Sequence, residues 1–153
     1  MPIWGLMASP IRDHCPVRSR QHGFTLVELL IVMLILGLIA AIAIPSFFSQ
    51  RNKANDADAK STARAAQTAI ETYATEHDDG YTGADSAALA EIEAVLPPGA
   101  PLAVLEAGPK NYSVTVTSFS ETVFSISRLP TGTVLYECDA GGEGGCPAGG
   151  DWG

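Results

Sequence analysis

The residue types that could do chemistry gather in one short segment, residues 23–28, which reads Gly-Phe-Thr-Leu-Val-Glu. Glu28 directly precedes twenty residues, 29–48, that contain no charge and a single polar side chain. A carboxylate costs about 2.5–3.5 kcal/mol in the middle of a membrane-spanning helix and less near the interface, so it is retained where something pairs with it. A basic segment ends in Gly23 directly before Phe24, which indicates proteolytic cleavage at that junction. Cleavage would place a new amino group four residues from Glu28, within reach of its carboxylate.

Other chemistry has little raw material in this sequence. The 153 residues include three histidines and three cysteines, too few for a histidine-based catalytic site or a Cys/His metal cage. Lys and Arg total 9 against 17 Asp and Glu, a formal net charge of −8, which argues against a nucleic-acid-binding surface. We therefore expect no enzymatic activity, no catalytic residues, no metal and no cofactor.

The apolar run is long enough to cross a bilayer as a helix. Twenty helical residues rise about 30 Å, roughly the thickness of the hydrocarbon core. Residues 1–23 are basic and contain several prolines, so no stable element is expected there. An ordinary secretory signal is the alternative, because Ala41-Ile42-Ala43 satisfies the A-x-A cleavage pattern. Against that alternative, the apolar run exceeds the usual signal core and Glu28 would be an odd inclusion.

Helical character continues beyond the apolar run into a polar half. Residues 51–77 contain neither Pro nor Gly and are rich in good helix formers. The two halves together predict one helix of roughly 50 residues that stops near Gly80. Five residues recur at helical spacing and are expected to form the face that a sheet covers: Ala59, Ala63, Ala66, Ile70 and Tyr73.

The rest of the chain predicts a small antiparallel sheet, which makes the fold class α+β. Asp85 is expected to cap a short helix that runs through Val95. Alternating polar and apolar residues, joined by short links, predict strands and hairpins. The expected strands are Leu102–Leu105, Tyr112–Ser118, Val123–Arg128 and Val134–Cys138.

Two late cysteines, Cys138 and Cys146, flank a seven-residue loop. A disulfide is expected there if the region is exported, because two cysteines make a poor metal site and exported compartments are oxidising. Cys15 precedes the cleavage junction and would be lost. The Gly-rich tail from Asp139 is expected to have few other contacts with the sheet. Its acids could indicate Ca²⁺, but their spacing matches no calcium-loop consensus, so a solvated acidic loop is expected.

The segment 18–50 resembles the class III signal of type IV prepilins and type II secretion pseudopilins. The resemblance implies that a membrane prepilin peptidase cuts after Gly23, that Phe24 becomes the N-methylated N-terminus, and that Glu28 is the assembly glutamate. The helix-breaking residues Gly37 and Pro45 stand at the places that the family pattern gives them. The leader is long for the family, and a start at Met7 would shorten it.

The resemblance implies a filament subunit that is made as a single-pass precursor in the cytoplasmic membrane. It divides the chain into a leader (1–23), a transmembrane and filament-core half-helix (24–50) and a soluble pilin-like domain (51–153). The implied partners are further copies of the chain, the peptidase and N-methyltransferase, an assembly ATPase with its inner-membrane platform protein, and membrane lipid before assembly. No nucleic-acid partner is expected for so acidic a subunit.

Two alternatives to a pilus subunit stay open. Within the family, the chain could be a pseudopilin of a type II secretion or DNA-uptake machine. From another class, it could be a secreted or membrane-anchored binding module with an ordinary signal. The identity and methylation of the mature N-terminal residue separate the second alternative from membership of the pilin family.

Overall fold

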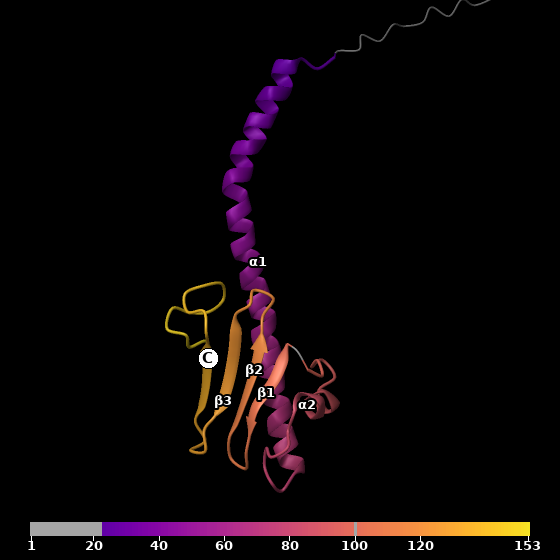
Figure 1. Ribbon diagram of the computed structural model, residues 1–153, viewed down its shortest axis with the longest axis vertical. Coiled ribbons are helices and arrows are strands. Elements are labelled where there is room, and N and C mark those ends of the chain that lie inside the picture. Colours follow the sequence, from indigo (N-terminus) through magenta and orange to yellow (C-terminus); the bar gives the residue numbers. More distant parts are fainter. Residues whose placement is uncertain (1–22, 100) are drawn as a thin grey trace, which may run out of the picture. The chain divides into compact units, whose positions relative to one another are not determined.

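The computed structural model describes residues 23–99 and 101–153, so the expectations for the leader before Gly23 lie outside the described residues. Two compact units divide the chain, one ending at Leu38 and one from Ile39 to Gly153, and each is described by itself. The secondary structure comprises two helices and four strands (Figure 1): α1 Leu26–Glu76, α2 Ser86–Ile92, β1 Leu102–Ala107, β2 Tyr112–Thr117, β3 Val123–Arg128 and β4 Val134–Cys138.

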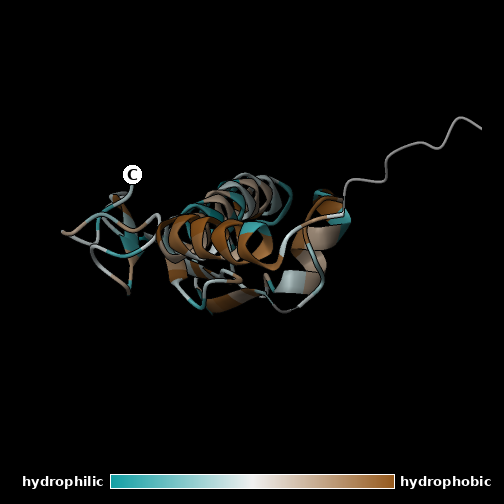
Figure 2. Cartoon of the chain, turned by 90° about the horizontal axis from the view of Figure 1, so that it is seen from above, coloured by the Kyte–Doolittle hydropathy of each residue, from teal (hydrophilic) through white to brown (hydrophobic). Residues whose placement is uncertain are grey.

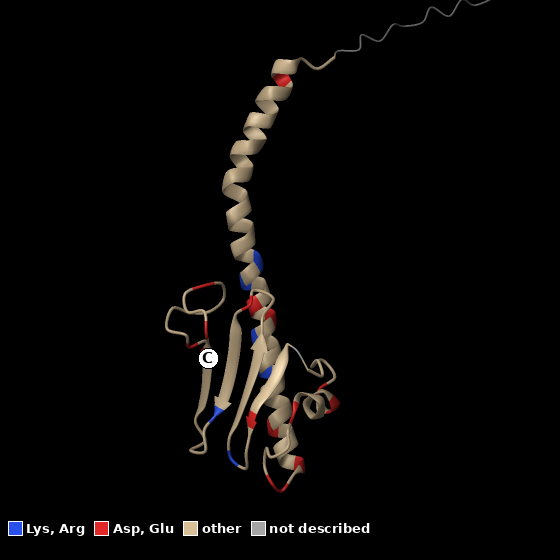
Figure 3. Ribbon diagram, in the orientation of Figure 1, with Lys and Arg blue, Asp and Glu red and all other residues tan. Residues whose placement is uncertain are grey.

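The long helix α1 has 51 residues, which agrees with the roughly 50 predicted for the joined apolar and polar halves. It is the one helix in the described part of the chain that is long and apolar enough to cross a membrane. Its apolar half carries exposed Leu, Ile, Val, Met and Phe side chains from Leu26 to Phe48, and Figure 2 shows these turns mostly in brown. Glu28 is the sole charge of residues 24–50 in the sequence; Figure 3 shows red near the start of the helix.

The helix continues through both of its predicted weak points, Gly37 and Pro45. Proline lacks a backbone N–H and its ring clashes with the carbonyl one turn earlier, while glycine weakens its own turn. Both residues are therefore places where this helix is easiest to open, although it is helical here throughout.

The cap is a four-stranded antiparallel meander in the order β1-β2-β3-β4. It packs on the polar half of α1, as Figure 1 shows. The predicted helix face is confirmed at four of its five positions, because Ala59, Ala63, Ala66 and Ile70 are buried. The fifth residue, Tyr73, is only partly buried and stacks on His77.

The predicted bounds of the strands agree closely with the structure, and those of the short helix α2 agree less well. The bounds of β3 and β4 match the prediction, whereas β1 extends to Ala107 across a register shift between Val104 and Glu106. Asp85 caps α2 as predicted, with its carboxylate accepting the Ala88 N–H at 2.8 Å. The helix ends at Ile92 and not at Val95, because Glu93 is already extended.

Candidate assembly site and the contacts that hold the cap

The start of α1 is a capping box made by Thr25 and Glu28. The Thr25 hydroxyl accepts the Glu28 backbone N–H at 3.2 Å, and a Glu28 carboxylate oxygen accepts the Thr25 backbone N–H at 3.4 Å. Such a reciprocal pair satisfies two of the donors that a helix N-terminus leaves free. Glu28 therefore has a local partner within its own chain, in addition to the helix dipole.

This role of Glu28 is one that the sequence reasoning missed. The signal was present, because Thr25-Leu-Val-Glu28 matches the pattern of Ser or Thr followed three residues later by an acidic residue, just before an apolar run. The capping box fixes the carboxylate near the Thr25 N–H, one peptide unit from the Phe24 nitrogen. The predicted cleavage would thus release its amine close to a carboxylate already held in place.

The residues at the predicted junction meet little around them. Phe24 is 82% exposed. A Cβ atom added at Gly23 would meet no other described atom within 4 Å, and the glycine has no left-handed φ. Nothing in the described chain therefore requires glycine at this position, so a requirement for it must come from a partner.

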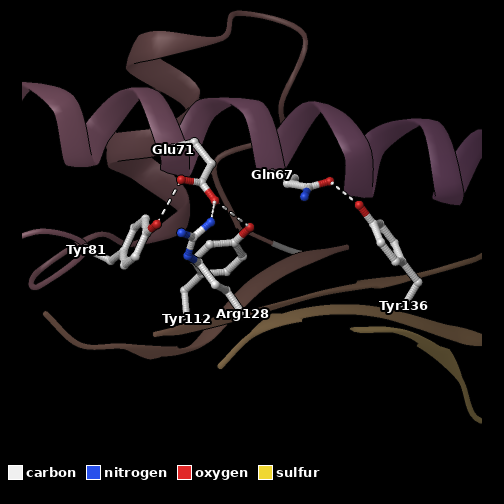
Figure 4. Close-up of polar contacts among 6 residues, drawn as sticks. All are labelled: Gln67, Glu71, Tyr81, Tyr112, Arg128 and Tyr136. Carbon is white, nitrogen blue, oxygen red and sulfur yellow. Dashed lines mark hydrogen bonds and ion pairs between the residues drawn. The ribbon is translucent and has the colours of Figure 1, made fainter. Parts of the chain in front are cut away.

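In the cap, the Glu71 carboxylate joins α1 to three residues of the loop and sheet (Figure 4). It accepts the hydroxyls of Tyr81 at 2.8 Å and Tyr112 at 3.1 Å, and it pairs with Arg128 at 3.0 Å. Burial and the nearby Glu71 carboxylate raise the pKa of Tyr81 to about 12, and the same causes raise the pKa of Tyr112. Both phenols therefore stay protonated and donate to Glu71.

Glu71→Ala is expected to destabilise the cap by about 2–3 kcal/mol, because it leaves the buried Tyr112 and Tyr81 hydroxyls without their acceptor. The measurement is urea unfolding of the detergent-solubilised chain, followed by tryptophan fluorescence. Arg128→Gln is the matched control and should cost under about 1 kcal/mol, since that ion pair is about one-third exposed. A Glu71→Ala cost of about 0.5 kcal/mol or less would contradict the assignment.

A second carboxylate, Asp56, holds two loops against one turn of α1. Asp56 is fully buried; it accepts the Ser120 hydroxyl of the β2–β3 turn and the Gly145 N–H of the disulfide loop at 2.7 Å. Lys60 donates to the Gly145 carbonyl at 2.6 Å. A Cβ atom at Gly145 would lie 2.8 Å from the Asp56 Cβ, so glycine permits this close approach.

Acid is expected to release these loops through Asp56. Burial alone would raise the pKa of Asp56, but hydrogen bonds from Ser120, Ser118 and Gly145 and the Lys60 charge outweigh it and hold the pKa below 3.8. A lowered pKa gives stability that is present above the unfolded value and is lost as pH falls through the folded value. The Gly145 N–H should therefore lose its protection against hydrogen exchange, relative to an unfolded amide at the same pH, as the pH falls below 3.8. Asp56→Ala removes the acceptor of the Gly145 N–H and should show fast exchange already at neutral pH; slow exchange there would contradict this.

The C-terminal tail differs from expectation in its contacts. Cys138 and Cys146 form the predicted disulfide, but the prediction of few other contacts is wrong because Trp152 is buried in the cap. Its ring packs edge-on against Phe124 and Tyr136, and its indole N–H donates to the Glu137 carbonyl at 2.8 Å. Glycine-rich composition concealed this single large apolar anchor, one residue before the end of the sequence given.

Acidic residues in the tail do not form a metal site in the described part of the chain, where no three or more His, Cys, Asp or Glu side chains are placed to share an ion. One of them is otherwise used, because the Asp139 carboxylate accepts the Val123 N–H at 2.8 Å. That hydrogen bond joins the first residue of β3 to the residue that follows β4.

Comparison with known proteins gives matches to part of the chain. Residues 18–44 match the prokaryotic N-terminal methylation motif. The chain is 42% identical to the type IV major pilin protein PilA of Myxococcus xanthus over 59 residues, which cover 39% of this chain and 27% of that protein. It is 38% identical to type II secretion system core protein G of Pseudomonas aeruginosa over 56 residues, 37% of this chain and 39% of that protein.

A third relative is competence protein ComGC of Halalkalibacterium halodurans, 35% identical over 66 residues, which cover 43% of this chain and 65% of that protein. Across these three relatives, the chain spans between 27% and 65% of the relative's length. The chain carries the N-terminal methylation motif on a type IV pilin-like α+β fold, and over part of its length it is similar to type IV pilins and to type II secretion system core protein G.

Proposed function

We propose that this chain is a structural subunit of a type IV pilus-like filament. It is made as a membrane-inserted prepilin, cleaved after Gly23, N-methylated on Phe24 and polymerised through its N-terminal helix. The observation that carries the proposal is the methylation motif over residues 18–44, which spans the junction at Gly23 and the capped Glu28. The leader is then 1–23, the membrane and filament-core half-helix 24–50, and the soluble domain 51–153.

The apolar half of α1 supports assembly through this helix. Its large side chains are exposed within their own chain from Leu26 to Phe48, and an apolar surface of this extent needs a cover. Lipid covers it in the precursor, and copies of the same helix cover it in the filament. The subunit is thus stored in the cytoplasmic membrane and moves to an extracellular or cell-envelope fibre.

The remaining sequence supports a water-facing cap. Removal of residues 1–23 leaves 6 basic and 16 acidic residues, and such a surplus keeps a fibre soluble. In this proposal the other partners are the prepilin peptidase and N-methyltransferase, the assembly ATPase and its inner-membrane platform protein.

Mass spectrometry of the mature N-terminus tests the proposal. The expected result is a chain that begins with N-methylated Phe24. A chain that begins at Ile44, after Ala43, would instead identify an ordinary secretory signal, and an uncut chain would identify a simple membrane anchor. Either result would overturn the proposed processing.

A pseudopilus subunit is the second candidate, and one observation favours it. The match to type II secretion system core protein G has nearly the same identity and coverage of this chain as the match to the PilA major pilin. Electron microscopy of cells that produce the chain separates the two candidates, because long surface fibres support the pilus and a short fibre confined to the envelope supports the pseudopilus.

A further inference from the structure

The most exposed aromatic residue of the cap lies at the β2–β3 turn. Phe119 is 93% exposed, yet it does not stand alone. Together with Phe48, Arg51, Asn52 and Asn55 of α1 it lines a groove of about 520 Å³. The groove therefore begins where the apolar half of the helix ends, and it combines two phenyl rings with a guanidinium group and two amides.

The turn that carries Phe119 is held firmly at its base. Ser118 donates its N–H to the Thr122 carbonyl at 2.8 Å, and both residues are buried. The Ser120 hydroxyl contacts the hydroxyls of Ser118 and Thr122 and donates to the buried Asp56. Phe119 is thus presented to its surroundings by a network of hydrogen bonds anchored on α1.

The groove adjoins the end of the apolar half of α1, and this position favours a membrane surface as its cover. Phe47 and Phe48 close the run that is apolar enough to span a membrane, and aromatic side chains are enriched at the membrane–water interface. Arg51 and Lys53 follow directly, and both are exposed; Figure 3 shows blue at this point of α1. Basic residues at this depth are attracted to anionic lipid headgroups.

We propose that Phe119 and this groove form a second membrane contact of the precursor. The two phenyl rings enter the interfacial layer, and Arg51 with the Asn52 and Asn55 amides binds the phosphate of an acidic phospholipid. This inference rests on the membrane-inserted precursor of the proposed function. The strongly acidic remainder of the cap is repelled by the same lipids, so the contact orients the cap with its β2–β3 turn toward the bilayer.

Tryptophan placed at two turns tests the inference. Phe119→Trp is compared with Thr131→Trp, an exposed position in the β3–β4 turn at the opposite end of β3. Both full-length chains are reconstituted into vesicles of phosphatidylcholine with phosphatidylglycerol. Each spectrum is corrected with the unsubstituted chain, which already contains two tryptophans. Phospholipids brominated near the headgroup end of their acyl chains serve as the quencher.

We expect the tryptophan at position 119 to emit at shorter wavelength and to be quenched, and the one at position 131 to emit as in water. Adding Arg51→Gln should reduce the docked population about fivefold in vesicles with phosphatidylglycerol and much less in phosphatidylcholine alone. Equal, unquenched emission from both positions in a chain that sediments with the vesicles would overturn the inference alone. Protection of position 119 that arises only in assembled filaments would overturn it in favour of a second copy. Failure to sediment with the vesicles would overturn the proposed precursor as well.

Discussion

Filament formation is expected to be lost when Glu28 is replaced by leucine, while membrane insertion and leader removal continue. In the proposed mature subunit Phe24 is the N-terminus and its methylated amine is positively charged, so Glu28→Leu would leave that charge unpaired among packed apolar helices. Removing one member of a buried ion pair costs about 3–5 kcal/mol, which lowers the affinity of each added subunit roughly a hundredfold or more. Electron microscopy gives the yield of filaments, and mass spectrometry confirms processing.

The capping box allows a second experiment, in which two variants separate the two candidate roles of Glu28. In the first role Glu28 is the cap partner of Thr25. In the second role its carboxylate forms an ion pair with the amine of a neighbouring subunit. Glu28→Gln retains a side-chain oxygen that can accept the Thr25 N–H but removes the charge. Thr25→Ala does the reverse, because it removes the hydroxyl that accepts the Glu28 N–H and leaves the carboxylate.

Charge pairing between subunits predicts that Glu28→Gln fails to assemble and that Thr25→Ala assembles with reduced yield. Loss of a capping side chain typically costs about 1 kcal/mol, far less than an unpaired buried charge. Glu28→Asp should keep part of the activity, since it is one methylene shorter. Abundant regular filaments from Glu28→Gln or Glu28→Leu would show the pairing argument to be wrong.

The periodic parts of this chain could be predicted from sequence because their signals are repeated many times. The alanine stripe from Ala59 to Ala66 and the alternation in β3 each involve several residues that point to the same face. An error at one position, such as Tyr73, does not change the element. The disulfide was predictable for a similar reason, since the last 100 residues contain one cysteine pair.

Single residues that act through tertiary contact could not be predicted in the same way. Nothing in the spacing of Asp56 distinguishes it from the exposed Asp58, and its burial follows from two loops that lie 64 and 89 residues further along the chain. Glu71 likewise gathers Tyr81, Tyr112 and Arg128 from separate elements. Partners of this kind are set by the packing of the sheet on α1, which a sequence pattern does not encode.

Gly23→Val is expected to leave a full-length, membrane-bound precursor and to abolish filaments. The argument depends on where the requirement for glycine originates. An added Cβ at this position meets no described atom of the chain within 4 Å, and the backbone needs no left-handed conformation. Folding of the cap should therefore be unchanged, and a failure to mature would arise at the proposed peptidase, which in the family that this segment resembles cuts after glycine.

Gly23→Ala serves as the matched variant, because a methyl group is the smallest side chain that the peptidase could encounter. We expect slow or partial cleavage for Gly23→Ala and none for Gly23→Val, so that the extent of cleavage decreases as the side chain becomes larger. The ratio of precursor to mature chain on immunoblots measures this directly. Tryptophan fluorescence, corrected for Trp4 of the uncleaved chains, reports the packed cap and should be the same in both variants. The ring of Trp152 packs against Phe124 and Tyr136, far along the chain from the junction. Normal maturation of Gly23→Val would place the cleavage junction elsewhere and would remove the reason for assigning the new amine to Phe24.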